Sequence, residues 1–255
     1  VAVTGSLGKT TITRLLAQLL SSYKSQAGHG TCRVLMGGNV GIGMLDLIQH
    51  QDAGDIGVLE LSSFQLEMNK KFAPDIAIWT NWYPNHLDWH GTAEDYFKAK
   101  STLLLFQHEY QNAVLSIDLF KGEAADWINA LLPQVKSTLN LCFVKKPTST
   151  DLACINCEKF WAFYFDEQSF FVKAQVVNKQ IQKQEQLCKI DRLPDITFMQ
   201  NWVQIFTTVY LLKFDISLLG SFLTQTPLVL DDHHHRLERC ASINGVDFYN
   251  DSKST

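Results

Sequence analysis

Residues 4–11 read Thr-Gly-Ser-Leu-Gly-Lys-Thr-Thr, and this stretch decides the fold. An apolar run at residues 1–3 precedes it, and apolar residues then recur at helical spacing over residues 9–20. A glycine turn between a strand and a helix lets backbone N–H groups surround a phosphate at the positive end of the helix. We therefore predict a phosphate-binding loop, in which Lys9 reaches the outer phosphates and the Thr10 hydroxyl binds Mg²⁺.

The glycine pattern is the short form of the phosphate-loop motif. A full Walker A pattern would require a glycine at position 3, where this chain has Val3. The alternative is a glycine turn that only starts a helix, but the strand before it and the Lys9-Thr10 pair after it favour a phosphate site. The predicted nucleotide contacts of the loop are Gly5, Ser6, Gly8, Lys9, Thr10 and Thr11.

Strands and helices alternate along the first half of the chain. Apolar segments typical of buried strands lie at residues 34–36, 56–61, 76–79 and 113–117, and helical spacing covers residues 93–106 and 124–132. This alternation predicts an α/β fold, in which helices flank both faces of a mostly parallel sheet.

The pattern changes after about residue 141. Aromatic and β-branched residues at 160–165 and 169–177 flank a polar turn and predict a hairpin, and helical spacing follows at 197–213 and 216–224. A second hairpin is predicted at 239–243 and 246–249, because Asn244-Gly245 between them is a strong turn signal. We expect this last hairpin to open a separate domain.

Composition excludes several classes of protein. The 255 residues are 46% hydrophobic and 19% charged, which is typical of a folded protein with a sizeable core. A net charge of −4 argues against a nucleic-acid partner, and the lack of a long apolar run argues against a membrane span. We expect a cytoplasmic monomer with reduced cysteines, since Cys154 and Cys157 form a lone CxxC without further ligands at zinc-site spacing.

Polar segments follow two of the apolar strands. Glu60 opens the string ELSSFQLE at residues 60–67, and His86 lies in the string TNWYPNHLDWHGT at residues 80–92. Ligands of open α/β sheets bind at the carboxyl ends of strands, so Glu60 is placed to hold a metal beside the phosphate loop. Lys100 stands on the helix that follows. Taken singly, these residues also fit a solvated turn, a structural histidine and a surface lysine.

Together, the three segments resemble the Mur ligase family. Its members share a TGxxGK[ST] loop, a strand-end glutamate, a TNxxxxHLDxHG string and a lysine on the next helix. The string ELSSFQLE is similar to that of the member that adds D-glutamate. Further similar strings are GGNVG at residues 37–41, HRLE at 235–238 and NDSKST at 250–255.

The resemblance implies a P-loop central ATP-binding domain at residues 1–232 and the start of a C-terminal ligase domain at 233–255. The N-terminal UDP-binding domain would lie outside the chain, which starts without Met inside an apolar strand. The implied activity is an ATP-dependent amide ligation in peptidoglycan synthesis, which adds D-glutamate to UDP-N-acetylmuramoyl-L-alanine through an acyl phosphate. We expect residues 1–255 alone to be inactive.

The resemblance also implies two Mg²⁺ sites. Thr10 and Glu60 would hold one ion, and Glu60, His86 and Lys100 the other. Lys100 would be carbamylated by CO₂, because an ammonium group cannot bind Mg²⁺ and the ion prefers oxygen ligands. With Lys9, the residues Glu60, His86 and Lys100 are the implied catalytic set.

Further contacts are implied by the same resemblance. Asn39, His86 and Thr255 are expected to contact the substrate. Asn201, Arg236, Asp251 and Lys253 are expected to contact the nucleotide, with domain closure as the gate.

Three positions depart from the family pattern. Leu7 replaces a polar residue of the phosphate loop, Thr197-Phe198 replaces a His-Asn pair, and Trp82-Tyr83 are bulky. Two alternatives stay open: another amide ligase of the superfamily, such as a folylpolyglutamate synthase, and a non-catalytic nucleotide-binding remnant. The string ELSSFQLE argues against the first.

Overall fold

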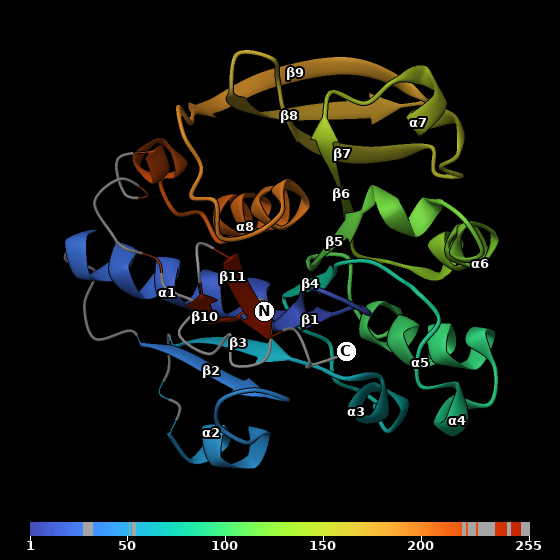
Figure 1. Ribbon diagram of the computed structural model, residues 1–255. Helices are drawn as coiled ribbons and strands as arrows, with labels where there is room; N and C mark the ends of the chain where they lie inside the picture. The colour runs from blue at the N-terminus through green and yellow to red at the C-terminus, as the bar shows by residue number, and fades with distance from the viewer. Residues whose placement is uncertain are drawn as a thin grey trace.

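A nine-stranded sheet forms the centre of the molecule in the computed structural model (Figure 1). The structure describes residues 1–27, 33–50, 52, 55–220, 223, 228, 238–243 and 246–250. The strand order is β2-β3-β1-β4-β5-β6-β7-β8-β9. β1 to β7 pair in parallel, and β8 and β9 continue the sheet in antiparallel pairing. The predicted α/β fold with a mostly parallel sheet is confirmed.

The strands of this sheet are β1 (Ala2–Thr4), β2 (Val34–Gly38), β3 (Ile56–Glu60), β4 (Ile76–Trp79), β5 (Asn112–Ser116), β6 (Thr138–Lys145), β7 (Lys159–Phe165), β8 (Phe170–Val177) and β9 (Gln180–Lys189). The helices are α1 (Lys9–Ala27), α2 (Met44–His50), α3 (Ser63–Glu67), α4 (Leu87–His90), α5 (Ala93–Leu105), α6 (Ala124–Leu131), α7 (Ser149–Ala153) and α8 (Met199–Leu211). Short 3-10 turns are η1 (Ile117–Phe120), η2 (Leu132–Gln134) and η3 (Ile216–Leu218).

The strand order reverses at β1. The chain leaves β1 for β2 and β3 on one side and then crosses to β4 on the other, so β1 pairs with both β3 and β4. In such sheets a crevice for ligands opens at the carboxyl ends of the strands where the order reverses. The carboxyl end of β1 is Thr4, directly before the predicted phosphate loop.

Two hydrophobic cores lie on opposite faces of the sheet (Figure 1). α5 and α6 cover one face, and α1 and α8 cover the other. α8 runs in the same direction as α1: Asn201 near its start faces Gly8, and the Asp215 N–H beyond its end donates to the Tyr23 hydroxyl at 2.8 Å. The positive ends of both helices therefore lie at the phosphate loop.

Two strands were missing from the sequence prediction. β6 is a mostly buried strand that contains Asn140, and periodicity alone does not separate such a segment from other buried structure. β9 is rich in Gln, Lys and Glu and mostly exposed, so it has no apolar face to detect. Its hydrogen bonds to β8 create the strand.

Helix limits near residue 200 also differ from the prediction. α8 begins at Met199 rather than at residue 197, because Phe198 is extended, with φ −69° and ψ 151°. The helix predicted over 216–224 starts as the 3-10 turn η3, and several of its later residues lie outside the described part of the chain.

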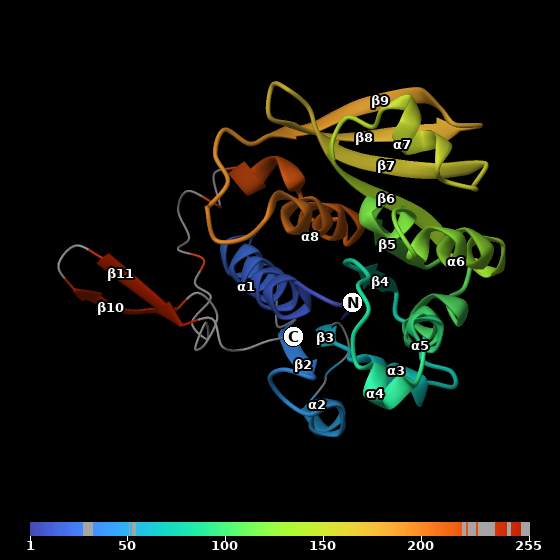
Figure 2. The same ribbon diagram turned by 45° about the vertical axis from the view of Figure 1, so that its right-hand side comes forward.

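The second predicted hairpin is confirmed. β10 (Glu238–Ile243) and β11 (Val246–Asn250) form a separate antiparallel sheet, which lies apart from the nine-stranded sheet in Figure 2. Asn244-Gly245, the turn signal between them, lies outside the described residues.

The cysteines match the expectation of reduced thiols in the part of the chain that the structure describes. Cys142, Cys154, Cys157 and Cys188 carry free thiols. The thiols of Cys154 and Cys157 each donate to a backbone carbonyl nearby. None of the helices in the described ranges is long and apolar enough to cross a membrane.

Gly38 offers a test of how tightly β2 approaches β3. Its φ is +101°, and an added Cβ would overlap the Glu60 carbonyl oxygen. Gly38→Ala should therefore lower the free energy of unfolding by about 1–3 kcal/mol. Urea denaturation followed by circular dichroism measures this.

Gly57→Ala on β3 is the matched control, because a Cβ there meets no atom within 4 Å. It should leave stability unchanged or raise it by up to about 1 kcal/mol. Equal destabilisation by both variants would contradict the close approach at Gly38.

Candidate active site

The loop between β1 and α1 has the backbone of a phosphate-binding turn. Gly5 has φ +145° and Gly8 has φ +80°, conformations that side-chain-bearing residues rarely adopt. A Cβ on Gly5 would overlap the Thr80 side chain, and one on Gly8 would lie 3.1 Å from Asn201 Oδ1. Glycine is thus required at both positions, and the loop is enclosed by the start of α8 and the end of β4.

Lys9 bends back over the loop. Its Nζ donates to the carbonyl oxygens of Gly5 and Ser6, each at 3.0 Å. Thr10 and Thr11 follow in the first turn of α1, where backbone N–H groups have no partner inside the helix. The loop therefore combines a cation with the positive end of a helix, the arrangement that an anion requires.

Asn81, just after β4, holds the loop from outside. Its side-chain Oδ1 accepts the Leu7 N–H at 2.8 Å, and its Nδ2 donates to the Leu7 carbonyl at 3.1 Å. Its backbone carbonyl accepts the Ser6 N–H at 3.2 Å. The Leu7 backbone is therefore fixed by Asn81, and the loop geometry does not need a polar side chain at position 7. Asn81 was not among the site residues predicted from the sequence, although the Thr-Asn pair after β4 stands at the same sheet edge as the loop.

Ser6 connects the loop to two further residues that sequence analysis left without a role. Its hydroxyl donates to the Tyr83 carbonyl at 2.9 Å and accepts the Tyr83 N–H at 2.8 Å. The Tyr96 hydroxyl on α5 lies 3.1 Å from the same Ser6 Oγ. Burial raises the pKa of Tyr96, so this phenol remains a neutral hydrogen-bonding group.

Glu60 ends β3 with one carboxylate oxygen unused. Asn39 Nδ2 donates to Glu60 Oε1 at 3.0 Å, which accounts for one oxygen. Oε2 is buried without a hydrogen-bond partner among the described residues. A buried carboxylate oxygen left without a donor is costly, and a bound cation removes that cost. The unused Glu60 oxygen therefore fits a hard metal ion such as Mg²⁺.

Lys100 is buried, so the alternative of a surface lysine is wrong. Its side chain lies on α5, only 1% of the residue is exposed, and Nζ donates to the Gly5 carbonyl at 2.9 Å. Nζ also lies 4.6 Å from the centre of the Tyr96 ring. Burial and the nearby Lys9 charge hold the pKa of Lys100 well below its usual value, and the Glu60 carboxylate opposes this shift. The neutral amine is thus accessible here.

His86 stands at the start of α4 in a left-handed conformation, with φ 54°. Burial, followed by the charges of Lys100 and Lys9, lowers the pKa of its imidazole. The neutral ring is the form that binds a metal. Phe64 packs beside it, with ring centroids 5.0 Å apart.

The structure brings most of the predicted site residues to one sheet edge. The charges of Lys9 and Lys100 lower the pKa of His86, and Lys100 in turn responds to the charges of Lys9 and Glu60. Asn39 donates to Glu60, and the Asn201 amide lies beside Gly8. Asn201 Nδ2 donates to Thr197 Oγ1 at 2.6 Å, so Thr197 orients this amide. The predicted contacts Arg236, Asp251, Lys253 and Thr255 lie outside the described residues.

The family model and the most similar relatives that we compared agree on one family, the Mur ligases. The model of the Mur ligase middle domain matches residues 3–138. A UDP-N-acetylmuramoylalanine–D-glutamate ligase of Streptococcus agalactiae is 31% identical over 255 residues, 100% of this chain and 48% of the relative. The enzyme of that name from Fervidobacterium nodosum is 30% identical over 258 residues, 100% of this chain and 47% of the relative. The chain thus spans about half the length of these relatives.

Solved structures share the fold. MurF from Acinetobacter baumannii superposes with a TM-score of 0.58 at 15% identity, covering 98% of this chain and 49% of that one. MurF from Thermotoga maritima in complex with ADP superposes with a TM-score of 0.52 at 17% identity, covering 98% and 52%.

Replacing Lys9 tests the phosphate loop. Lys9→Ala removes a charge-assisted contact to phosphate, which should weaken Mg·ATP binding by about 1.5–3 kcal/mol, or about 10- to 150-fold. Isothermal titration calorimetry measures the affinity. Lys98→Ala is the control, since Lys98 is exposed on α5 and pairs only with surface carboxylates. Equal affinity of the Lys9→Ala and unaltered proteins would refute the loop assignment.

Proposed function

The chain belongs to the Mur ligase middle-domain family, and from this premise we propose that it is the ATP-binding part of a UDP-N-acetylmuramoylalanine–D-glutamate ligase. One observation carries the proposal: the buried Lys100 donates to the Gly5 carbonyl of the phosphate loop and lies within reach of the Glu60 charge. The names of the relatives and the string ELSSFQLE at residues 60–67 support D-glutamate as the amino acid added.

The reaction joins a carboxylate to an amine in two steps. A substrate carboxylate oxygen takes the γ-phosphoryl group of ATP and ADP leaves, which forms an acyl phosphate. The D-glutamate amine then attacks the acyl carbon, phosphate leaves, and the amide forms with loss of a proton. Both steps spread negative charge over phosphate oxygens, so catalysis depends on positioned cations and N–H donors.

The residues of this chain supply those groups. Lys9 and the N-terminus of α1 stabilise charge on the outer phosphates. Thr10 and Glu60 would hold one Mg²⁺, and Glu60, His86 and Lys100 would hold the other. Bound Mg²⁺ offsets the negative charge of the transferred group. Asn39 keeps the Glu60 carboxylate oriented and would contact the substrate.

Lys100 acts as a carbamate in this proposal. Its neutral Nζ attacks the carbon of CO₂, a new N–C bond forms, and one proton leaves, which yields an anionic oxygen ligand for the metal. The low pKa of Lys100 makes the neutral amine available. Because deprotonation precedes attack, CO₂ uptake rises with pH and does so at a lower pH than for an exposed lysine.

Domain roles follow the same proposal. Residues 1–232 form the central domain, and residues 233–255, which include β10 and β11, begin the C-terminal domain. Arg236, Asp251, Lys253 and Thr255 close over the nucleotide and substrate from that side, while Asn201 contacts the nucleotide next to Gly8.

Substrate dependence tests the function directly. In the full-length protein, phosphate release should require ATP, UDP-N-acetylmuramoyl-L-alanine and D-glutamate together. Residues 1–255 alone should release none, because holding both substrates in line contributes about 7–11 kcal/mol and needs the rest of the enzyme. Release with a folate substrate, or nucleotide binding without any turnover by the full-length protein, would contradict the assignment.

Lys100 gives the sharpest test of the site. In the full-length enzyme, Lys100→Ala should abolish most activity, and added short carboxylic acids should restore part of it by replacing the carbamate. Incubation with ¹³C-bicarbonate should give a carbamate signal in the unaltered protein that the variant lacks. Lys98→Ala, two residues away on the exposed side of α5, should keep both activity and signal. Normal activity of Lys100→Ala would rule the carbamate out.

A further inference from the structure

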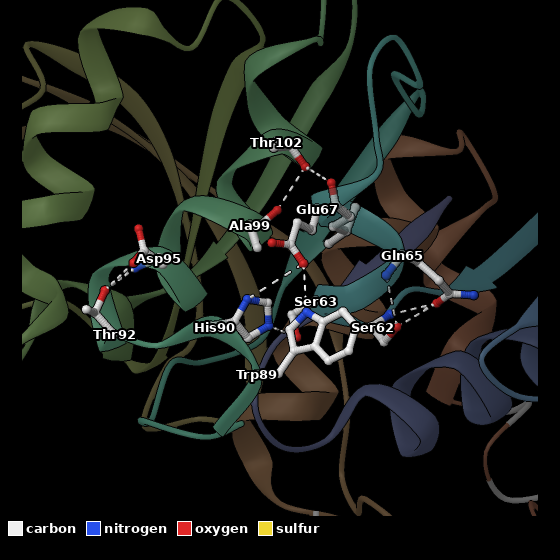
Figure 3. Close-up of polar contacts among 11 residues, drawn as sticks. Ser62, Ser63, Gln65, Glu67, Trp89, His90, Thr92, Asp95, Ala99 and Thr102 are labelled. Carbon is white, nitrogen blue, oxygen red and sulfur yellow. Dashed lines mark hydrogen bonds and ion pairs between the residues drawn. The ribbon is translucent and has the colours of Figure 1, made fainter. Parts of the chain in front are cut away.

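A second polar cluster lies beside the site, where α4 packs against α3 (Figure 3). His90 Nε2 and the Ser63 hydroxyl are 3.0 Å apart, and His90 Nδ1 lies 4.0 Å from a Glu67 carboxylate oxygen. The same oxygen accepts the Trp89 indole N–H at 2.9 Å. A serine, a histidine and an acid thus stand in the order that many hydrolases use.

Burial excludes a nucleophilic role for this serine. Ser63 is 2% exposed and His90 is 8% exposed, so the hydroxyl faces the protein interior. The distance of 4.0 Å between His90 and Glu67 is too long for the hydrogen bond that orients a catalytic base. The His90 ring is instead stacked on Phe64, with centroids 5.6 Å apart. His90 therefore connects α4 to α3 through its contacts with Ser63 and Phe64.

The connected elements directly follow two proposed metal ligands. Ser63 opens α3, just after Glu60 at the end of β3. His90 closes α4, which His86 opens. The contact between Ser63 and His90 therefore ties the chain segment after one ligand to the segment after the other.

Through the backbone of α4, the position of His86 depends on the contact between His90 and Ser63. His86 is left-handed, a conformation that persists at a non-glycine residue only where the surroundings impose it. The backbone N–H groups of Trp89 and His90 both donate to the His86 carbonyl, at 3.1 and 3.0 Å. The buried His90 side chain anchors this single turn, because the Trp89 side chain at the same end is 66% exposed.

The His90 ring also lies beside α5, the helix that carries the third proposed ligand. Tyr96, one turn before Lys100 on α5, lies 5.4 Å from His90 between ring centroids. One buried imidazole thus touches α3 and α5 from α4, the three helices that follow or carry Glu60, His86 and Lys100.

We propose that His90 is a positioning residue of the metal site. By joining α4 to Ser63, it sets the separation of His86 from Glu60 and hence the affinity for the second metal ion. This inference rests on the metal ligands assigned under the proposed function. Residues that orient metal ligands without touching the metal typically change affinity by about 10- to 100-fold when they are replaced.

The experiment measures metal binding directly in the full-length protein. Mn²⁺ replaces Mg²⁺ as a probe for electron paramagnetic resonance, with ADP present. His90→Phe keeps the ring packing on Phe64 and Tyr96 but removes both nitrogens, and should weaken Mn²⁺ binding by about 10- to 100-fold. His90→Gln, whose amide retains a group able to bond Ser63, should recover most of this loss. Ser63→Ala should weaken binding in the same direction.

Trp89→Phe is the matched control on α4. It removes the bond to Glu67 at the exposed side and should leave Mn²⁺ affinity within about twofold. If His90→Phe lowers the melting temperature but binds Mn²⁺ like the unaltered protein, His90 is structural only and the proposal is overturned. If His90→Phe does not fold, the Ser63→Ala result decides in the same way. If the unaltered protein binds no Mn²⁺ beyond that held by ADP, the metal assignment itself fails and the inference falls with it.

Discussion

The carbonyl oxygen of Gly5 accepts hydrogen bonds from two lysines, and the chemistry of the site depends on this arrangement. Lys9 reaches it from the start of α1 and Lys100 from α5, at 3.0 and 2.9 Å. Two ammonium groups this close repel each other, and the burial of Lys100 removes the water that would screen them. The lower pKa of Lys100 relieves the repulsion in the protein alone.

The topology of the sheet makes this convergence possible. β1 stands between β3 and β4, so the phosphate loop, Glu60 and the segment after β4 all emerge at one edge. α5 then returns across the same end of the sheet and delivers Lys100 beneath the loop. Parallel strands repeat this placement at every carboxyl end, which explains why residues far apart in the chain meet in one crevice.

Hydrogen bonds between loops make the edge rigid. Asn81 binds the Leu7 backbone at two points, and Ser6 joins Tyr83 and Tyr96 through one hydroxyl. The segment that carries His86 is therefore fastened to the phosphate loop rather than free beside it. A nonpolar residue at position 7 is compatible with this arrangement, because only its backbone takes part.

The sequence by itself determined the fold class, the phosphate loop and the family, because these depend on contiguous residues. The two glycines and the helix start of the predicted phosphate loop all lie within residues 4–11. Tertiary structure alone decided the burial of Lys100, the unused oxygen of Glu60 and the contact between Ser63 and His90. It also decided β9, whose polar sequence becomes a strand only by pairing with β8. Each of these depends on which strands and helices become neighbours, and that choice follows from packing between distant segments that local spacing does not encode.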